Sequence, residues 1–241
     1  MIPGWLAWLI ATPFLGVAVL YTGSTLWKWA WLRLIWVPAT VDHYRRQQDK
    51  DPANPKWPQK LGFLYECRMK QGPPDERTQW AKPATAEYEK WLALTGPINH
   101  DYSFLSRLSQ TALVAGEWEK ARRYATRLVK MAERHPERGN AHHHGHIVLG
   151  RLALRSGQVQ RAMEHLLAAG QTSGSPQLNS FGPQMNLAYE LLEAGERDCV
   201  LQYLTLCSAF WRIGRRTLDR WTGEIRMGQT PPSWRQSFGS R

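Results

Sequence analysis

The sequence predicts an all-α protein, in which one N-terminal transmembrane helix is followed by a solenoid of helical hairpins and a C-terminal capping helix. One supporting observation is an apolar stretch without charges at the N-terminus. The other is a helical apolar pattern that recurs three times from about residue 101 onward, each time ending at a glycine. We divide the chain into an anchor (1–41), a linker with two short helices (42–98), a repeat domain (99–228) and a flexible tail (229–241).

The N-terminal segment has the length and the flanks of a spanning helix. Residues 5–26 supply about 22 uncharged residues, enough to cross a hydrocarbon core of about 30 Å. Nothing basic precedes the apolar core, and the core is longer than that of a signal peptide. Tryptophans gather near both of its ends, as at a membrane interface; they are Trp5, Trp8, Trp27, Trp29, Trp31 and Trp36.

The first positive charges, Lys28 and Arg33, follow this segment. They predict a single-pass membrane protein whose N-terminus lies outside and whose main domain is cytoplasmic. Three arrangements stay open for residues 24–37, which could extend the spanning helix, lie in the interface or pack on another membrane protein. We expect Pro38 to end this segment.

The charge distribution indicates which class of partner the protein binds. The formal net charge is +11, and much of the excess lies near the apolar segment and in about the last forty residues. This distribution, without any nucleic-acid motif, favours anionic lipid headgroups or a protein partner over nucleic acid.

The three cysteines form no CxxC pair, and Cys199 and Cys207 lie two turns apart on one predicted helix. Reduced thiols fit a cytoplasmic compartment.

The region between anchor and repeats is predicted to be a strap. Residues 49–58 are rich in proline and charge, which is typical of a linker. Two short helices are expected after it, over residues 59–70 and 84–94, and each is followed by a Gly-Pro sequence.

The repeat domain contains three helices that end at Gly116, Gly157 and Gly195, which are 41 and 38 residues apart. A second amphipathic helix follows each glycine. The predicted apolar stripes of these second helices are Trp118, Ala121, Ala125, Leu128 and Ala132; Val159, Ala162, Leu166 and Ala169; and Val200, Tyr203, Leu204, Cys207 and Trp211. Such periodic hairpins indicate a helical solenoid.

These units carry a resemblance to the tetratricopeptide repeat (TPR) family over residues 101–210. The matching positions are Leu149-Gly150, Ala153, Gly157, Ala162 and Leu166 in the middle unit, Leu108-Ser109, Ala112, Gly116, Ala121 and Pro136 in the first, and Leu187-Ala188, Leu191, Gly195 and Leu204 in the third. The units are longer than the usual 34 or so residues, and they lack the early Trp and Tyr of the family pattern. Val200 also stands where the family has Ala. The resemblance therefore implies a TPR-like, rather than a regular TPR, domain that binds proteins.

In that family the first helix of each unit lines a concave groove. By position, the resemblance maps this partner groove onto Gln110, His144, Arg151, Leu154, Arg155, Met185 and Tyr189. The two arginines would suit a peptide with a carboxylate, because a guanidinium binds a carboxylate through paired hydrogen bonds. The alternative is an ordinary solvated helix face.

A histidine cluster offers a different chemistry. His142 and His146 lie one helical turn apart, a spacing that can chelate Zn²⁺, and His143, His144 and His165 are close in the predicted fold. No Cys or carboxylate stands at ligand spacing, so we interpret these residues as packing histidines. A metal- or pH-responsive regulator is the alternative function.

The end of the chain is predicted to close the repeat domain. Leu218, Trp221 and Ile225 continue a helical apolar pattern, which fits a capping helix. Its other face is basic and could contact anionic lipid or an acidic partner. Residues 174–183 are interpreted as a structural turn rather than a partner-binding loop, and residues 229–241 as a flexible tail.

No catalytic motif is recognisable in the chain. We therefore expect a protein that is not an enzyme and needs no cofactor. The hypothesis is a membrane-anchored scaffold, an accessory or assembly subunit of a membrane protein complex that acts through protein–protein contacts.

Overall fold

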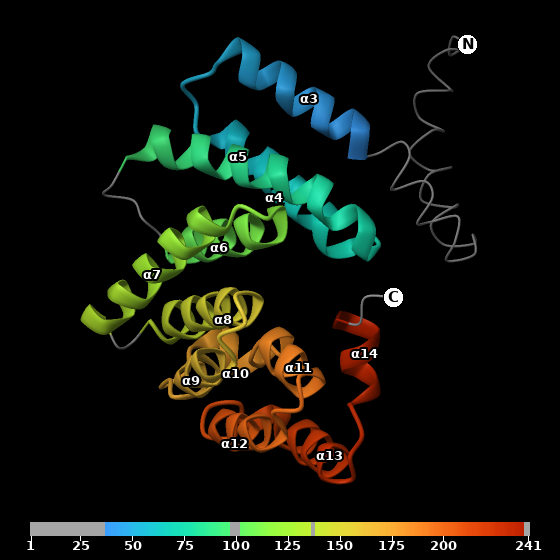
Figure 1. Ribbon diagram of the computed structural model, residues 1–241. Coiled ribbons are helices and arrows are strands. Elements are labelled where there is room, and N and C mark those ends of the chain that lie inside the picture. The colour runs from blue at the N-terminus through green and yellow to red at the C-terminus, as the bar shows by residue number, and fades with distance from the viewer. Residues whose placement is uncertain (1–36, 97–101, 136–137, 239–241) are drawn as a thin grey trace, which may run out of the picture.

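The computed structural model describes residues 37–96, 102–135 and 138–238 (Figure 1). Every regular element in these ranges is a helix, which confirms the predicted all-α class. The α-helices are α3 (Val37–Lys50), α4 (Lys56–Gln71), α5 (Arg77–Thr95), α6 (Tyr102–Ala115), α7 (Trp118–Arg134), α8 (Gly139–Arg155), α9 (Val159–Gly170), α10 (Pro176–Phe181), α11 (Asn186–Glu193), α12 (Arg197–Cys207), α13 (Arg215–Arg226) and α14 (Pro232–Phe238). Two short 3₁₀ turns, η2 (Pro74–Glu76) and η4 (Arg212–Gly214), precede α5 and α13.

The predicted membrane anchor lies almost wholly outside the described residues. Its spanning segment, its tryptophans, Lys28 and Arg33 all fall within residues 1–36. Only residues 37–41 of the anchor are described, and they belong to α3. Within the described ranges, no helix combines the length and the apolar character that a membrane span requires.

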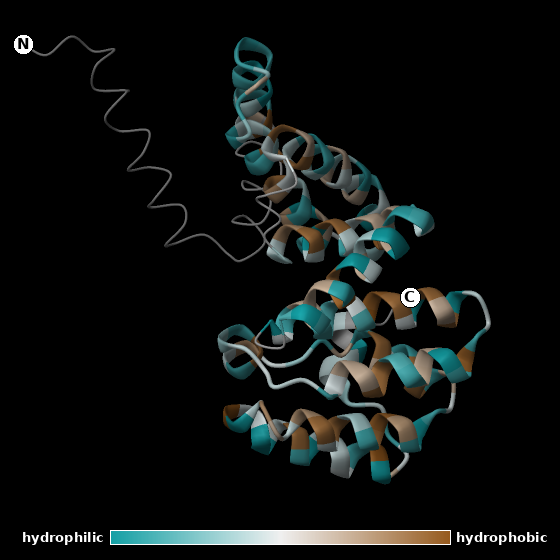
Figure 2. Cartoon of the chain, turned by 90° about the vertical axis from the view of Figure 1, so that its left-hand side faces the viewer, coloured by the Kyte–Doolittle hydropathy of each residue, from teal (hydrophilic) through white to brown (hydrophobic). Residues whose placement is uncertain are grey.

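The helices are stacked in sequence order, from α3 at the top of Figure 1 to α12 and α13 at the bottom. Neighbours along the chain pair closely, as α4 does with α5, α6 with α7 and α8 with α9. Contacts between pairs join α6 to α8, α8 to α11 and α9 to α12. Figure 2 shows that the helices carry both apolar and hydrophilic residues, as expected of helices that bury one face.

The three predicted glycine turns share one construction. The φ angles are 79° at Gly116, 72° at Gly157 and 94° at Gly195, a left-handed conformation that glycine adopts without steric cost. In each turn the residue after the glycine donates its N–H to a carbonyl five residues back, which is the Schellman ending of a helix. These donor–acceptor pairs are Glu117–Ala112, Gln158–Ala153 and Glu196–Leu191, all at 2.9 Å. The predicted helix ends are confirmed.

Most residues of the predicted stripes are buried in the core. Leu128, Leu166 and Tyr203 are each fully buried, one on each of α7, α9 and α12. Trp118 is an exception, because 42% of its surface is exposed. The Arg155 guanidinium lies 4.8 Å from the centre of the Trp118 ring, so a cation rather than the core covers this side chain.

The predicted linker is more ordered than its composition suggested. Helices α3, α4 and α5 occupy most of residues 42–98, and the proline-rich stretch contributes only a short connection before α4. Proline favours the first turn of a helix, where its missing N–H is not needed. Pro55 and Pro58 stand in such positions at the start of α4. Helix α5 also packs on α6, where Tyr88 joins the cluster around Leu105 and Leu108.

Part of the predicted flexible tail is a helix. Gly228 (φ 81°) ends α13 with a turn of the same kind, and the chain then forms α14. Trp234 of α14 is only 1% exposed and lies edge-on to Trp221, with ring centroids 5.3 Å apart. Helix α14 contacts α11, so it folds back beside the earlier helices (Figure 1). Burial of one large side chain stabilises this short helix despite its polar composition.

We predict that Trp234→Ala detaches α14 without unfolding the rest of the protein. A buried tryptophan contributes about 3–5 kcal/mol, more than so short a terminal helix gains by other means. Limited proteolysis should therefore cut near Arg235 much faster in the variant. Substitution of Trp118, which is half-exposed, serves as the control. Unchanged protection of α14 in Trp234→Ala would contradict the prediction.

Candidate functional site

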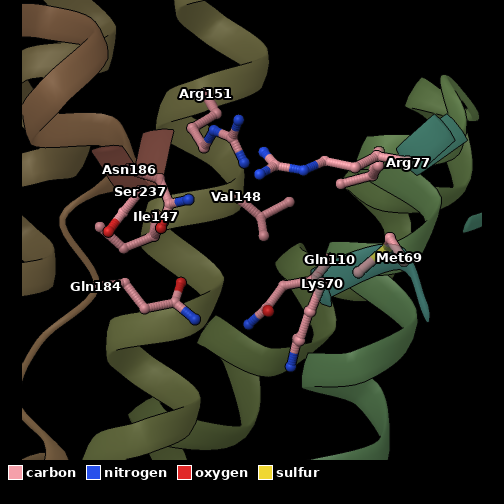
Figure 3. Close-up of a pocket in the computed structure, with 11 residues that line it drawn as sticks. Met69, Lys70, Arg77, Gln110, Ile147, Val148, Arg151, Gln184, Asn186 and Ser237 are labelled. Carbon is pink, nitrogen blue, oxygen red and sulfur yellow. The ribbon is translucent and has the colours of Figure 1, made fainter. Parts of the chain in front are cut away.

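A polar cavity of about 210 Å³ lies where six helices and the chain before α11 meet (Figure 3). Helices α4, α5, α6, α8, α11 and α14 contribute to it, with the segment that leads into α11. Its lining residues are Met69, Lys70, Arg77, Gln110, Val114, Ile147, Val148, Arg151, Gln184, Asn186 and Ser237. Three of these side chains are cationic, several carry amides, and none is acidic.

The cations of this cavity differ in their partners. Arg151 binds Glu190 of α11 through two nitrogens, with Nε 2.9 Å and Nη2 2.6 Å from Oε1. Lys70 pairs with Glu66 at 2.5 Å. The Nε of Arg77 is buried, and within the described residues it has no hydrogen-bond partner. Figure 3 shows the guanidinium groups of Arg77 and Arg151 pointing toward one another across the cavity. Two facing cations make this a site of positive potential.

Glu66 is a buried carboxylate that pairs with the cations beside the polar cavity. It is 3% exposed, accepts a hydrogen bond from the Tyr88 hydroxyl at 2.6 Å, and pairs with both Lys70 and Arg107. Burial raises the pKa of Glu66, but Lys70, Tyr88 and Arg107 together outweigh this effect and hold it below its usual range. These contacts connect α4 to α5 and α6, and they fix Lys70 at the cavity edge.

A second, more apolar cavity of about 470 Å³ lies further along α4 and α6, toward their N-termini. Its lining residues are Tyr44, Gln59, Lys60, Phe63, Leu64, Tyr88, Ser103, Phe104 and Arg107. Phe63 is 50% exposed, and the Arg107 guanidinium lies 5.4 Å from the centre of its ring. Lys60 lies 4.9 Å from the ring centre of Tyr44. This cavity therefore has aromatic walls with cations beside them, and it lies on the same side of α4 and α6 as the polar cavity.

The predicted groove residues are only partly brought together. Gln110 and Arg151 line the polar cavity, and His144 accepts a hydrogen bond from the Gln110 amide at 2.9 Å. Leu154 and Tyr189 pack against the core, and Arg155 covers Trp118. Met185 is 4% exposed and borders a third cavity, of about 350 Å³, beside α14. The groove prediction therefore identified α6 and α8 as helices that line the polar cavity, but it missed the other elements of the site.

Sequence reasoning missed the residues that α4, α5 and α14 supply. Lys70 and Arg77 come from the region interpreted as a strap, and Ser237 from the region interpreted as a flexible tail. The available signal was the helical apolar spacing of residues 59–70, which already predicted a helix with a buried face. Counting that hairpin as a stacked unit would have placed both cations beside Gln110.

The histidines are tied to the backbone of α9. His143 is fully buried; its Nδ1–H donates to the Ala169 carbonyl at 2.9 Å, and its Nε2 accepts the N–H of Gln184 at 3.0 Å. His142 donates from Nε2 to the Ala168 carbonyl at 2.7 Å. The described ranges contain no group of three or more His, Cys, Asp or Glu residues that could hold a metal ion. These contacts fit packing histidines.

Two further histidines meet each other. The Nδ1 atoms of His146 and His165 are 3.0 Å apart, so one of them carries the shared hydrogen. Burial and the neighbouring His142 and His165 lower the pKa of His146 to about 3. Burial likewise lowers the pKa of His143 to about 3 and that of His144 to about 4. These three rings are therefore neutral in the folded protein at physiological pH.

No protein-family model matches this chain, and no curated protein sequence matches it. The arrangement of its own side chains is therefore the basis for a functional conclusion.

Proposed function

We propose that this protein is a membrane-anchored, TPR-like scaffold that binds a protein partner, as an accessory or assembly subunit of a membrane complex. The apolar segment at residues 5–26 is long enough for the anchor, and the positive residues after it favour a cytoplasmic domain. The helical hairpins supply the binding surface. This function needs neither a cofactor nor a catalytic group.

The observation that carries the proposal is the pair of cavities along α4 and α6. One is lined by aromatic rings with Lys60 and Arg107, and the other by Lys70, Arg77 and Arg151. Protein-binding surfaces combine apolar pockets, which supply most of the affinity, with charges that select the partner. A partner segment with an apolar side chain and acidic neighbours would match both cavities in succession.

The three glycine turns, and the close approach of α8 to α9 and α11 at Gly150, support the TPR-like description. All three glycine turns have the same hydrogen bonds, which suits a repeating hairpin. In the Leu149-Gly150 pair, a Cβ on Gly150 would lie 2.3 Å from Cδ2 of Leu187 and 3.3 Å from the Ala162 carbonyl. The small residue therefore lets α8 approach both α9 and α11, as expected at the position that carries the resemblance.

The contact between His146 and His165 favours a second candidate, a pH-responsive regulator. The hydrogen shared between their Nδ1 atoms requires at least one neutral ring. Protonation of both rings would replace this hydrogen bond with repulsion between α8 and α9. Release of a partner at a pH where the domain stays folded would support this alternative.

The test of the proposed function is a pull-down of tagged full-length protein from native membranes in mild detergent, beside a form lacking residues 1–36. We expect a stoichiometric partner whose recovery falls at least tenfold with Phe63→Ser, because removal of an interface anchor costs at least about 1.4 kcal/mol. Phe63 is 50% exposed, so this change should leave folding intact.

Phe181→Ser is the matched control, because Phe181 is 85% exposed and lies on α10, away from both cavities. Recovery that persists in both Phe variants but disappears without residues 1–36 would assign the contact to the anchor. If neither the full-length protein nor the shortened form retains a partner, the scaffold proposal fails.

A further inference from the structure

The polar cavity holds more positive charge than its neighbours compensate. Lys70 and Arg107 share the single carboxylate of Glu66, and Arg151 pairs with Glu190. Arg77 makes no ion pair with any described residue, although it points toward Arg151 (Figure 3). The three cations of the cavity and Arg107, which lines the second cavity, thus share two carboxylates, which leaves two positive charges without a counter-charge among the described residues. Such an excess in a half-enclosed space is stabilised when an anion binds.

The donors around this excess come from several directions. The Arg77 and Arg151 side chains approach from opposite walls. Gln184, before α11, and Asn186, the first residue of α11, bring amides, whereas the Gln110 amide already donates to Ser106 and His144. Ser237 adds a hydroxyl from α14. Nε and Nη2 of Arg151 are engaged by Glu190, so its Nη1 remains for a ligand. Donors spread in this way match a tetrahedral oxyanion better than the flat edge of one carboxylate.

We propose that this cavity binds a phosphate group, held between Arg77 and Arg151. A phosphate dianion carries close to two negative charges at neutral pH and so matches the excess of two positive charges. The cavity volume of about 210 Å³ admits a phosphate together with a small substituent. Guanidinium groups bind phosphate oxygens through paired, charge-assisted hydrogen bonds. A bound phosphate would occupy the place proposed for the partner's acidic residues, whereas Phe63 lines the other cavity, so the two contacts are tested separately.

The phosphate could be free inorganic phosphate or a phosphomonoester, and the same chemistry serves both. The experiment is isothermal titration calorimetry on the full-length protein in mild detergent, at constant ionic strength and pH 7.5. The probes are inorganic phosphate, glycerol 3-phosphate, N-acetyl-O-phosphoserine amide and succinate. We expect saturable binding of one phosphate, at least tenfold tighter than succinate. Tighter binding of either ester than of inorganic phosphate would assign the natural ligand to the esters.

Arg77→Gln should weaken phosphate binding at least tenfold, and Arg77→Lys should restore only part of it, because lysine keeps the charge but loses the forked donors. Arg220→Gln is the control, since Arg220 is exposed on α13. Each variant is melted without phosphate to confirm that it is folded. Equal binding of succinate and phosphate, or equal losses in Arg77→Gln and Arg220→Gln, would overturn the proposal. So would the absence of saturable binding by every probe.

Discussion

Acidification from about pH 8 to about pH 5 is expected to remove about 4–6 kcal/mol of folding stability, because three histidines stay neutral in the folded protein. The lowered pKa values are about 3 for His143 and His146 and about 4 for His144. In the unfolded chain the same rings take up protons below about pH 6.5. The unfolded state therefore binds more protons in this window, and stability falls as the pH falls.

The size of this effect follows from the number of rings. Each histidine that must stay neutral contributes about 2 kcal/mol by pH 5, since one pKa unit corresponds to about 1.4 kcal/mol. Typical domains are stable by only about 5–15 kcal/mol, so the loss could approach complete unfolding. Glu66 adds to this at lower pH, because its pKa lies below its usual range and its ion pairs are lost when it is protonated.

Burial sets the direction of the pKa shift of these rings, and the groups that face them add to it. His142 and His165 face His146, and the positive charge of Lys70 further lowers the pKa of His144. Urea unfolding followed by circular dichroism at pH 8, 6.5 and 5 measures the loss of stability. His146→Gln should reduce the pH dependence by about a third, because one of three rings no longer titrates. A stability that is flat from pH 8 to pH 5 would contradict the assignment of three neutral rings.

Most helix positions could be predicted because their signals are local. The glycines at 116, 157 and 195 end helices through backbone geometry that needs no tertiary partner. The stripes of α7, α9 and α12 follow helical spacing, and each buries the expected side chains apart from partly covered ends such as Trp118. The glycine turns and the helical spacing of apolar residues therefore predict both where a helix lies and which of its faces is buried.

The binding cavities could not be predicted in the same way. They depend on α4 and α5 stacking against α6, and the proline-rich sequence before α4 indicated a linker instead. Helix α14 illustrates the same limit, because its order depends on Trp234 reaching Trp221 and α11, which local composition does not reveal. The mapped groove residues Gln110 and Arg151 line the polar cavity, whereas Arg77, which forms no ion pair with the described residues, comes from the hairpin that was interpreted as a strap.

Gly139→Ala should destabilise the protein by about 3 kcal/mol or more, because the new methyl group meets backbone that cannot move away. A Cβ at this position would lie 2.0 Å from the Gly174 carbonyl oxygen and 2.6 Å from Oγ1 of Thr172. The loop is held there, since Ser175 donates a hydrogen bond to Asn140 at 2.8 Å and also caps α10. The same result would support the interpretation of residues 174–183 as a structural turn, and urea unfolding measures it.

Gly223→Ala provides the matched control, for which we expect a change in stability of the opposite sign. No atom lies within 4 Å of a Cβ at Gly223, which is inside α13. Alanine favours a helix over glycine by about 0.5–1 kcal/mol, so this variant should be slightly more stable than the parent protein. Gly139 is the first residue of α8, where alanine gains less than in a helix interior, and this gain is too small to offset a collision with the main chain. Equal stability of the two variants would show that the loop can move away from α8, and the turn at residues 174–183 would then be free to act as a binding segment.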